Sequence, residues 1–286
     1  MSPRRIRKDQ QGTMSTLVLE NEKVRAVVVP DLGARILSLT YKPTETDFAW
    51  HSPDAALKKP TTELENVSGF FDCVPTTDPC TFKGRNLPLG GEVSSTPWRI
   101  LKTEQTRNAA RIRAEAKCKI YPLLIRKEIT LAKNKSILIL RHELHNLSNE
   151  TLEYHYSSHN TLQVSPFHRI VLPSEVTKVK LGYASQFGKM GDEITWPESI
   201  DNKGERVDIS KIRGPCEKTM QNLYTARLKD RWCALVNEAK REAIGFRVEG
   251  DTLPYILICT NNSGWRDYYF AVIEPVTGRP ETSTSR

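Results

Sequence analysis

Two polar residues lie in segments whose surroundings suit acid–base chemistry. Glu274 ends the run YYFAVIE at 268–274, directly after aromatic and aliphatic residues. A glutamate with a reference pKa of about 4.3 can act as a base near neutrality when apolar rings bury it. His159 lies in the segment YSSHN at 156–160, and an imidazole with a pKa of about 6.5 is a suitable partner acid. A strand-end ion pair between Glu274 and Arg279, and a loop histidine bonded to backbone, are the alternatives.

The remaining histidines and the cysteines do not predict a metal site. His142 and His145 are three residues apart on an expected strand, so their side chains should point to opposite faces. The six cysteines are dispersed and include no CxxC pair, which argues against a zinc knuckle. No apolar segment follows the basic N-terminus, so we expect no secretory signal, a reducing cytoplasmic location and free thiols.

Short β-strands are the elements that must position these residues. Residues 110–120 alternate between apolar side chains and Arg, Lys or Glu, which is the period of a strand with one solvated face. We find no long amphipathic helical pattern. The sequence therefore predicts an all-β fold, a large antiparallel β-sandwich with under about 15% helix, and a long surface excursion at 182–217. The other expected strands span 16–20, 24–29, 34–40, 97–102, 123–131, 136–145, 151–157, 175–181, 223–228, 232–236, 243–248, 255–260 and 268–274.

Composition bounds the class of protein. The chain has 286 residues, of which 38% are hydrophobic and 27% charged, and 42 basic against 34 acidic residues give a net charge of +8. No apolar run approaches the ~20 residues of a membrane helix, so we expect no membrane partner. Basic and acidic residues alternate outside the N-terminus, so we expect no nucleic-acid partner. We predict a basic flexible tail at 1–14 and a single domain at 15–286, whose positive charge favours an anionic small molecule.

Four motifs, in order along the chain, resemble the aldose 1-epimerase (galactose mutarotase-like) superfamily. The resemblance extends from about residue 16 to residue 281, and the motifs are more specific together than singly. They are PDLGAR at 30–35; GFFDCVP at 69–75 with LPLGGE at 87–92 and PW at 97–98; YSSHN at 156–160 with HRIVLP at 168–173; and YYFAVIEP at 268–275.

The resemblance implies a β-sandwich with an open sugar-binding face and an isomerase that interconverts sugar anomers. Glu274 matches the family's carboxylate, and His159 matches its proton-donating histidine. Loss of the anomeric hydroxyl proton to the carboxylate and protonation of the ring oxygen by the histidine would open a pyranose without metal or cofactor. A base and an acid on either side of the C1–O5 bond should have their side-chain tips about 5–8 Å apart.

Six further residues are candidates for contacting the sugar. Their side chains suit an anionic substituent, ring hydroxyls or an apolar sugar face, and they are Arg35, Asp72, Asp78, Arg85, Glu92 and Trp265. Each has an alternative role: Arg35 could be a solvated surface arginine, Asp72 could cap a turn, and Trp265 could be a packed rim aromatic.

One position departs from the family's pattern. The family often carries a second histidine where this sequence has Gly90, in the segment LPLGGE at 87–92. Glycine has no side chain to bind the sugar or share proton transfer. Three functions therefore stay open: an aldose 1-epimerase-like isomerase, a non-catalytic carbohydrate-binding or sensing protein, and a sugar lyase or glycoside-cleaving enzyme on the same scaffold.

Overall fold

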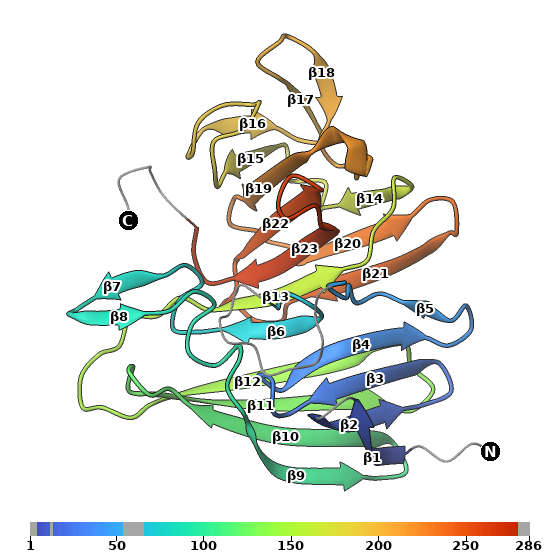
Figure 1. Ribbon diagram of the computed structural model, residues 1–286, viewed down its shortest axis with the longest axis vertical. Helices are drawn as coiled ribbons and strands as arrows, with labels where there is room; N and C mark the ends of the chain where they lie inside the picture. Colours follow the sequence, from blue (N-terminus) through green and yellow to red (C-terminus); the bar gives the residue numbers. More distant parts are fainter. Residues whose placement is uncertain (1–4, 12–13, 54–65, 280–286) are drawn as a thin grey trace. The chain divides into compact units, whose positions relative to one another are not determined.

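A computed structural model describes residues 5–11, 14–53 and 66–279 of the chain (Figure 1). The chain, for which the sequence predicted one domain at 15–286, divides into two compact units, Met1–Ser158 and His159–Arg286. Strands make up 53% of the structure, and the only regular helix in the described ranges is the 3-10 helix η2, Pro215–Glu217. This confirms the predicted all-β class. Within the same ranges, no helix is long and apolar enough to cross a membrane.

The described residues of unit 1 form twelve strands before the boundary, arranged in two sheets and a hairpin. In sequence order they are β1 (Arg5–Gln11), β2 (Met14–Glu20), β3 (Val24–Val29), β4 (Arg35–Tyr41), β5 (Thr46–Asp47), β6 (Phe70–Cys73), β7 (Cys80–Phe82), β8 (Arg85–Leu87), β9 (Arg99–Gln105), β10 (Ala109–Lys117), β11 (Leu123–Ala132) and β12 (Leu138–Asn146). One sheet has the order β1-β2-β3-β4-β6 with β5 beside β4, the second has the order β12-β11-β10-β9, and β7 pairs with β8.

The N-terminal residues form a strand where the sequence predicted a basic tail. Residues 5–11 make up β1, which pairs antiparallel with β2 from Arg5 opposite Glu20 to Gln11 opposite Met14. Met14 then packs into a buried cluster with Val29, Leu32 and Leu37. The first four residues, 12–13 and the segment 54–65 lie outside the described residues.

Strand β10 confirms the predicted alternation, and its end is set by Glu92. Ile112 and Ala114 are buried, whereas Arg113 between them is exposed. The strand stops at Lys117 although the apolar–polar pattern continues to residue 120. The buried Glu92 carboxylate accepts hydrogen bonds from the three backbone N–H groups of residues 119, 120 and 121, at 2.7, 2.7 and 2.8 Å. These bonds hold a turn in place of further strand.

Unit 2 is also built from antiparallel strands. They are β13 (Ser157–Leu162, which begins two residues before the boundary), β14 (His168–Val171), β15 (Lys178–Leu181), β16 (Glu193–Thr195), β17 (Glu198–Ile200), β18 (Arg206–Asp208), β19 (Thr219–Thr225), β20 (Trp232–Asn237), β21 (Glu242–Arg247), β22 (Tyr255–Asn262) and β23 (Tyr269–Val276). The main sheet of the unit has the order β13-β23-β22-β19-β15-β16, a second has the order β14-β20-β21, and β17 pairs with β18.

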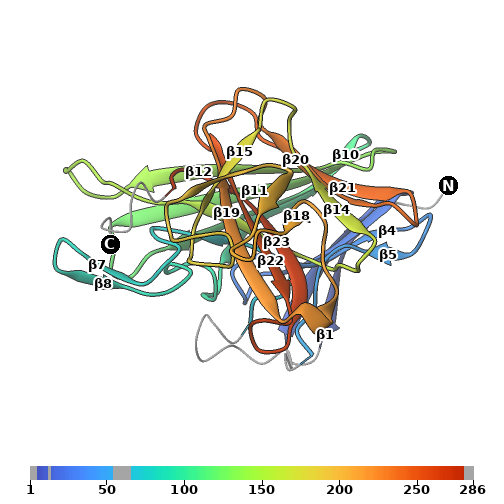
Figure 2. The same ribbon diagram turned by 90° about the horizontal axis from the view of Figure 1, so that it is seen from above.

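Strands β22 and β23 are the central strands of the main unit 2 sheet. Both are buried along nearly their whole length, which agrees with the apolar runs at 255–259 of β22 and 269–273 of β23. They pair with Leu257 opposite Glu274 and Cys259 opposite Val272. Figure 2 shows β19, β22 and β23 running side by side. The two residues of each opposed pair point to the same face, so this register fixes which side chains surround Glu274.

The main departures from the predicted strands are in short polar segments. Residues 151–156 form no strand, and the strand in this region is β13, which begins at Ser157 and reads SSHNTL. The predicted excursion at 182–217 contains three short strands, β16, β17 and β18, together with η2. Apolar alternation cannot reveal such segments, because polar side chains or loop-length strands carry no clear period.

Candidate active site

His159 and Glu274 are brought together by adjacent strands of unit 2. His159 lies on β13 and Glu274 on β23, and Asn160 donates a side-chain hydrogen bond to the Ile273 carbonyl at 2.8 Å across this strand pair. The distance from His159 Nε2 to Glu274 Oε1 is 3.7 Å, with side-chain exposures of 16% and 4%. The two groups predicted to act as acid and base therefore lie next to each other.

The separation is shorter than the predicted gap of about 5–8 Å, because His159 lies within a strand beside β23 and not in a loop after one. A distance of 3.7 Å exceeds a normal hydrogen bond, so the pair is close without being locked together. The two reacting oxygens of a pyranose, the anomeric oxygen and the ring oxygen, are bonded to the same carbon. An acid and a base this close can each reach one of them.

The side chains around Glu274 are mostly apolar. Leu257 lies opposite Glu274 in the register, and Cys259, Val272 and Phe270 belong to the same face. Burial raises the pKa of the Cys259 thiol above its usual range, and the nearby Glu274 charge raises it further. The carboxylate thus lies among groups that exclude water, where a proton transfer meets little competition from solvent.

Thr161 contacts the other ring nitrogen of His159. Its Oγ1 is 3.1 Å from His159 Nδ1, and the two residues share a face because they are two positions apart on β13. This contact holds the ring in an orientation that leaves Nε2 on the side of Glu274. Thr161 is not among the residues predicted from the sequence, although the pattern His-x-Thr on a strand places the two side chains on one face.

Trp265 lies in the turn between β22 and β23, on aromatic neighbours. Its backbone N–H donates to Asn261 Oδ1 at 3.0 Å, and its ring meets Tyr268 and Phe270 edge-on at 5.5 and 6.3 Å between centroids. Phe270 is four residues before Glu274, roughly 13 Å along the strand. Trp265 thus packs at the far end of this face, and its role in stacking on a sugar stays a prediction.

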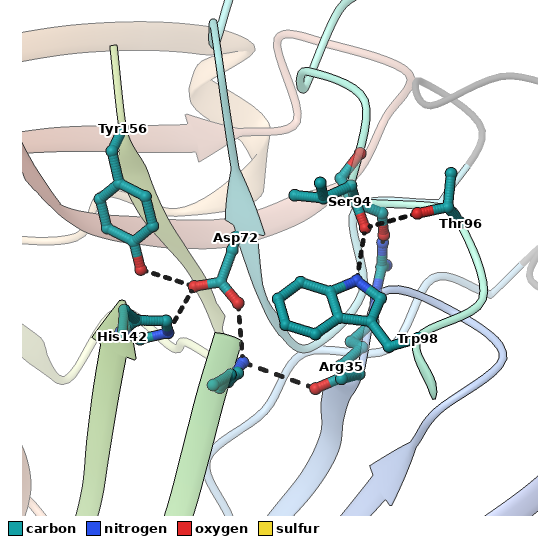
Figure 3. A network of polar contacts seen from close by, with 10 residues as sticks. Arg35, Asp72, Ser94, Thr96, Trp98, His142 and Tyr156 are labelled. Atoms are coloured by element: carbon teal, nitrogen blue, oxygen red, sulfur yellow. Dashed lines mark hydrogen bonds and ion pairs between the residues drawn. The ribbon is translucent and has the colours of Figure 1, made fainter. Parts of the chain in front are cut away.

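Asp72 is the centre of a buried polar network in unit 1 (Figure 3). Its Oδ2 accepts a hydrogen bond from Lys127 Nζ at 2.9 Å, and its Oδ1 accepts one from the Tyr156 hydroxyl at 2.6 Å. His142 Nε2 lies 2.9 Å from the same Oδ1. Figure 3 shows His142 and Tyr156 converging on one oxygen of the carboxylate.

These partners keep Asp72 ionised. Burial alone would raise its pKa, but the Lys127 ammonium and the His142 ring, with hydrogen bonds from His142 and Tyr156, hold the pKa well below its usual range. Burial, together with the negative charge of Asp72, raises the pKa of the Tyr156 hydroxyl, so that this group remains a donor. The network accounts for both carboxylate oxygens, and a role in binding sugar hydroxyls stays a prediction for Asp72.

Arg35 is buried, with 1% of its surface exposed, so it is not a solvated surface arginine. Its Nη1 donates to the carbonyls of Asn66 and Ser68 at 2.7 and 2.8 Å, and its Nη2 donates to the Ser94 carbonyl at 3.3 Å. The guanidinium lies 4.1 Å from the centroid of the Phe71 ring, and burial lowers the pKa of Arg35 to about 9. These contacts tie separate loops of unit 1 together, and its contact with an anionic substituent stays a prediction.

Three other candidates lie elsewhere in unit 1. The Glu92 carboxylate accepts the hydrogen bonds described above from the backbone N–H groups of residues 119–121. Asp78 is exposed, and its carbonyl accepts a hydrogen bond from Thr76 Oγ1 at 2.6 Å. The half-buried Arg85 places its guanidinium 5.8 Å from the Tyr121 ring centroid. Their contacts with a sugar stay predictions.

Gly90 occupies a backbone conformation that suits glycine. Its φ is +74°, in the left-handed region, and its N–H donates to the Thr77 carbonyl at 2.7 Å. A histidine side chain here would be strained. Across the described residues, no group of three or more His, Cys, Asp or Glu side chains could hold a metal ion.

Solved structures of other proteins share this fold. The Slr1438 protein from Synechocystis sp. PCC 6803 matches with a TM-score of 0.72 at 13% identity, covering 98% of this chain and 90% of that chain. A galactose mutarotase-like protein from Clostridium acetobutylicum gives 0.68 at 12% identity, covering 97% and 89%. A galactose mutarotase related enzyme from Lactobacillus acidophilus gives 0.67 at 14% identity, covering 94% and 88%. No family model and no curated protein matches the sequence.

These similarities define the class of fold. The chain has the galactose mutarotase-like β-sandwich fold, which confirms the fold that the sequence motifs predicted. At identities of 12–14% the likeness concerns the fold alone, so the function must be argued from the residues.

Proposed function

We propose that the protein is an aldose 1-epimerase-type isomerase that interconverts the anomers of a sugar, with Glu274 as the base and His159 as the acid. The observation that carries this proposal is the 3.7 Å distance between His159 Nε2 and Glu274 Oε1 on one face of the main unit 2 sheet. The mutarotase-like fold supports the same chemistry as a scaffold. The ligand in this proposal is a small sugar.

The proposed reaction needs only proton transfers. Glu274 takes the proton of the anomeric hydroxyl, and the electrons of that O–H bond form the C1 carbonyl. The C1–O5 bond breaks, and O5 takes a proton from His159 Nε2. After rotation about C1–C2, the O5 hydroxyl attacks the other face of C1, returns its proton to His159, and the new anomeric oxygen takes its proton from Glu274.

The neighbour of Glu274 favours this reaction over glycoside cleavage. Glycoside hydrolases generally use two carboxyl groups placed about 5–9.5 Å apart, whereas the group beside Glu274 is an imidazole. A non-catalytic sugar-binding protein is the second candidate, because Gly90 replaces a family histidine and its φ of +74° disfavours any side chain there.

We also propose a cytoplasmic location for this enzyme. All six cysteines are free thiols. Burial raises the pKa of Cys118 to about 12 and that of the fully buried Cys233 beyond its usual range. Free thiols held in the protonated, unreactive form are typical of proteins in a reducing compartment.

Exchange NMR between sugar anomers tests the proposal. We expect wild-type protein to accelerate exchange of at least one sugar in a panel of neutral and acidic aldoses. His159→Gln should slow that exchange by about 10²–10⁴-fold, because it removes a positioned proton donor. His51→Gln, at an exposed histidine in unit 1, is the matched control and should leave the rate unchanged. If wild-type protein binds sugars but exchanges anomers no faster than buffer does, the protein is a sugar-binding protein and not an isomerase.

A further inference from the structure

Unit 2 contains a cavity of about 370 Å³ at one end of its main sheet. Its walls come from residues 175–180, which lead into β15, from residues 226–229 after β19, from Glu193 on β16 and from Arg279 after β23. The volume falls within the range of small-molecule sites, about 300–1,000 Å³.

The walls of this cavity are strongly basic. Its cationic side chains are Lys178, Lys180, Arg227, Lys229 and Arg279, and its only carboxylates among the described residues are Glu175 and Glu193. One oxygen of Glu175 already accepts hydrogen bonds from the backbone N–H groups of Lys229 and Asp230, at 2.8 and 3.3 Å. Glu193 lies 4.0 Å from Lys178. Cations therefore exceed carboxylates by five to two.

Part of this positive charge has no carboxylate opposite it. Throughout the described ranges, no ion pair within 4.0 Å is found for Arg227, Lys229 or Arg279. Arg279 is held by a hydrogen bond to the Thr225 carbonyl at 3.3 Å and lies 5.6 Å from the Tyr255 ring centroid. Its Nε is buried with no hydrogen-bond partner in the described structure. An anion would satisfy such a donor.

One residue of the cavity wall, Lys180, can be traced to the face that carries Glu274. Lys180 lies opposite Tyr224, Tyr224 opposite Leu257, and Leu257 opposite Glu274. Opposed residues share a face, so Lys180 and Glu274 lie on the same face. Three strand spacings separate their backbones, roughly 14 Å. Lys180 is 8% exposed and lines the cavity.

We propose that this cavity is an anion-binding site that takes a phosphate monoester group. Several cations around one cavity match a dianion with three acceptor oxygens, and arginine forks bind phosphate with paired hydrogen bonds. The phosphate can belong to the sugar that reaches Glu274 or to a separate phosphorylated molecule bound beside it. The anion-binding step itself does not depend on the proposed isomerase activity.

Calorimetric titration at constant ionic strength tests this site, with inorganic phosphate and a hexose 6-phosphate as probes and the free hexose for comparison. We expect both phosphate probes to bind, with Arg227→Gln and Arg279→Gln each weakening binding about tenfold. Lys203→Met, at an exposed lysine elsewhere in unit 2, removes one charge as well and should change affinity less than twofold. Arg227 is exposed, so its variant should fold normally even where Arg279→Gln does not.

Two further comparisons complete the test. Glu274→Gln should bind inorganic phosphate as tightly as wild type, so a failure of the isomerase proposal leaves this result intact. If inorganic phosphate competes with the hexose phosphate but leaves the exchange rate of a neutral sugar unchanged, the phosphate group belongs to the sugar. If inorganic phosphate alters the exchange rate of a neutral sugar, the group belongs to a separate ligand. Either result supports the site. No phosphate binding by wild type, or equal losses in Lys203→Met and Arg227→Gln, would overturn it.

Discussion

The two units each bury one carboxylate among strands, but they surround it differently. In unit 1, Asp72 is 1% exposed and has the Tyr156 hydroxyl at 2.6 Å and the Lys127 ammonium at 2.9 Å. In unit 2, Glu274 is 3% exposed, and the His159 ring lies 3.7 Å from its carboxylate. The two buried carboxylates thus differ in a named neighbour: a lysine ammonium lies beside Asp72, and an imidazole lies beside Glu274.

This difference suits the two carboxylates to different chemistry. Asp72 is held ionised by strong donors, so it accepts no proton near neutrality. His159 and Glu274 are within reach of each other but beyond a normal hydrogen bond, and an anomeric centre placed beside the pair can meet one group with each of its two oxygens. Burial of a carboxylate is therefore a poor guide to catalysis, and its partners are a better one.

Removing the lysine beside Asp72 should have the largest effect on stability. Lys127→Met leaves a buried carboxylate without its ammonium, and breaking such a pair costs about 3–5 kcal/mol of unfolding free energy. Denaturant unfolding measures this loss. Lys102→Met is the matched control, since Lys102 is 57% exposed and 3.6 Å from Glu104, and it should cost under about 0.5 kcal/mol. Equal losses in the two variants would contradict the role of the Asp72 network.

The pH dependence of stability should sharpen the contrast. The pKa of Asp72 is lower in the folded than in the unfolded state, so its stabilising effect is complete above an unfolded pKa of about 3.9 and is lost as pH falls through the folded pKa. The difference in unfolding free energy between wild type and Asp72→Asn should therefore be constant from about pH 5 to 7 and shrink below about pH 4. Urea titrations across this range check it, and a difference that grows on acidification would be inconsistent with an ionised Asp72.

A smaller effect is expected from Thr161. Thr161→Val removes the hydroxyl 3.1 Å from His159 Nδ1 and should lower the anomer-exchange rate by about tenfold, since the ring loses a contact that orients it. The pH profile of exchange should shift as well, which a purely structural role would not cause. Thr161→Ser restores a hydroxyl and should recover most of the rate. An unchanged pH profile of the exchange rate in Thr161→Val would contradict a role for Thr161 in the site.

The sequence predicts the class of fold well because alternation is a local signal. The period of two in β10 and the apolar runs of β22 and β23 identify these strands without knowledge of their partners. Strand β13 escapes this reasoning, because its sequence SSHNTL is polar. The strand that carries His159 is thus among those that periodicity misses, and the family resemblance was needed to select that histidine.

The partners of Asp72 were beyond reach of the sequence for a different reason. Lys127 and Tyr156 lie 55 and 84 residues from Asp72 along the chain. Their convergence depends on how strands from separate hairpins pair and on which face each residue occupies, and one step of register would point the lysine the other way. Asp72 was therefore predicted as a sugar ligand from its turn, whereas the structure surrounds it with a lysine, a histidine and a tyrosine.

The most direct test compares the two carboxylates under one assay. Glu274→Gln and Asp72→Asn are made as matched amide variants, and anomer exchange is measured by NMR on fully folded protein, with unfolding free energies from denaturant titration. We expect Glu274→Gln to slow exchange by about 10²–10⁴-fold with little loss of stability, and Asp72→Asn to lose stability while the folded enzyme retains most of its rate. The division between the two carboxylates would be contradicted if Glu274→Gln exchanged anomers as fast as an active wild type. It would also be contradicted if folded Asp72→Asn protein lost as much of the exchange rate as Glu274→Gln.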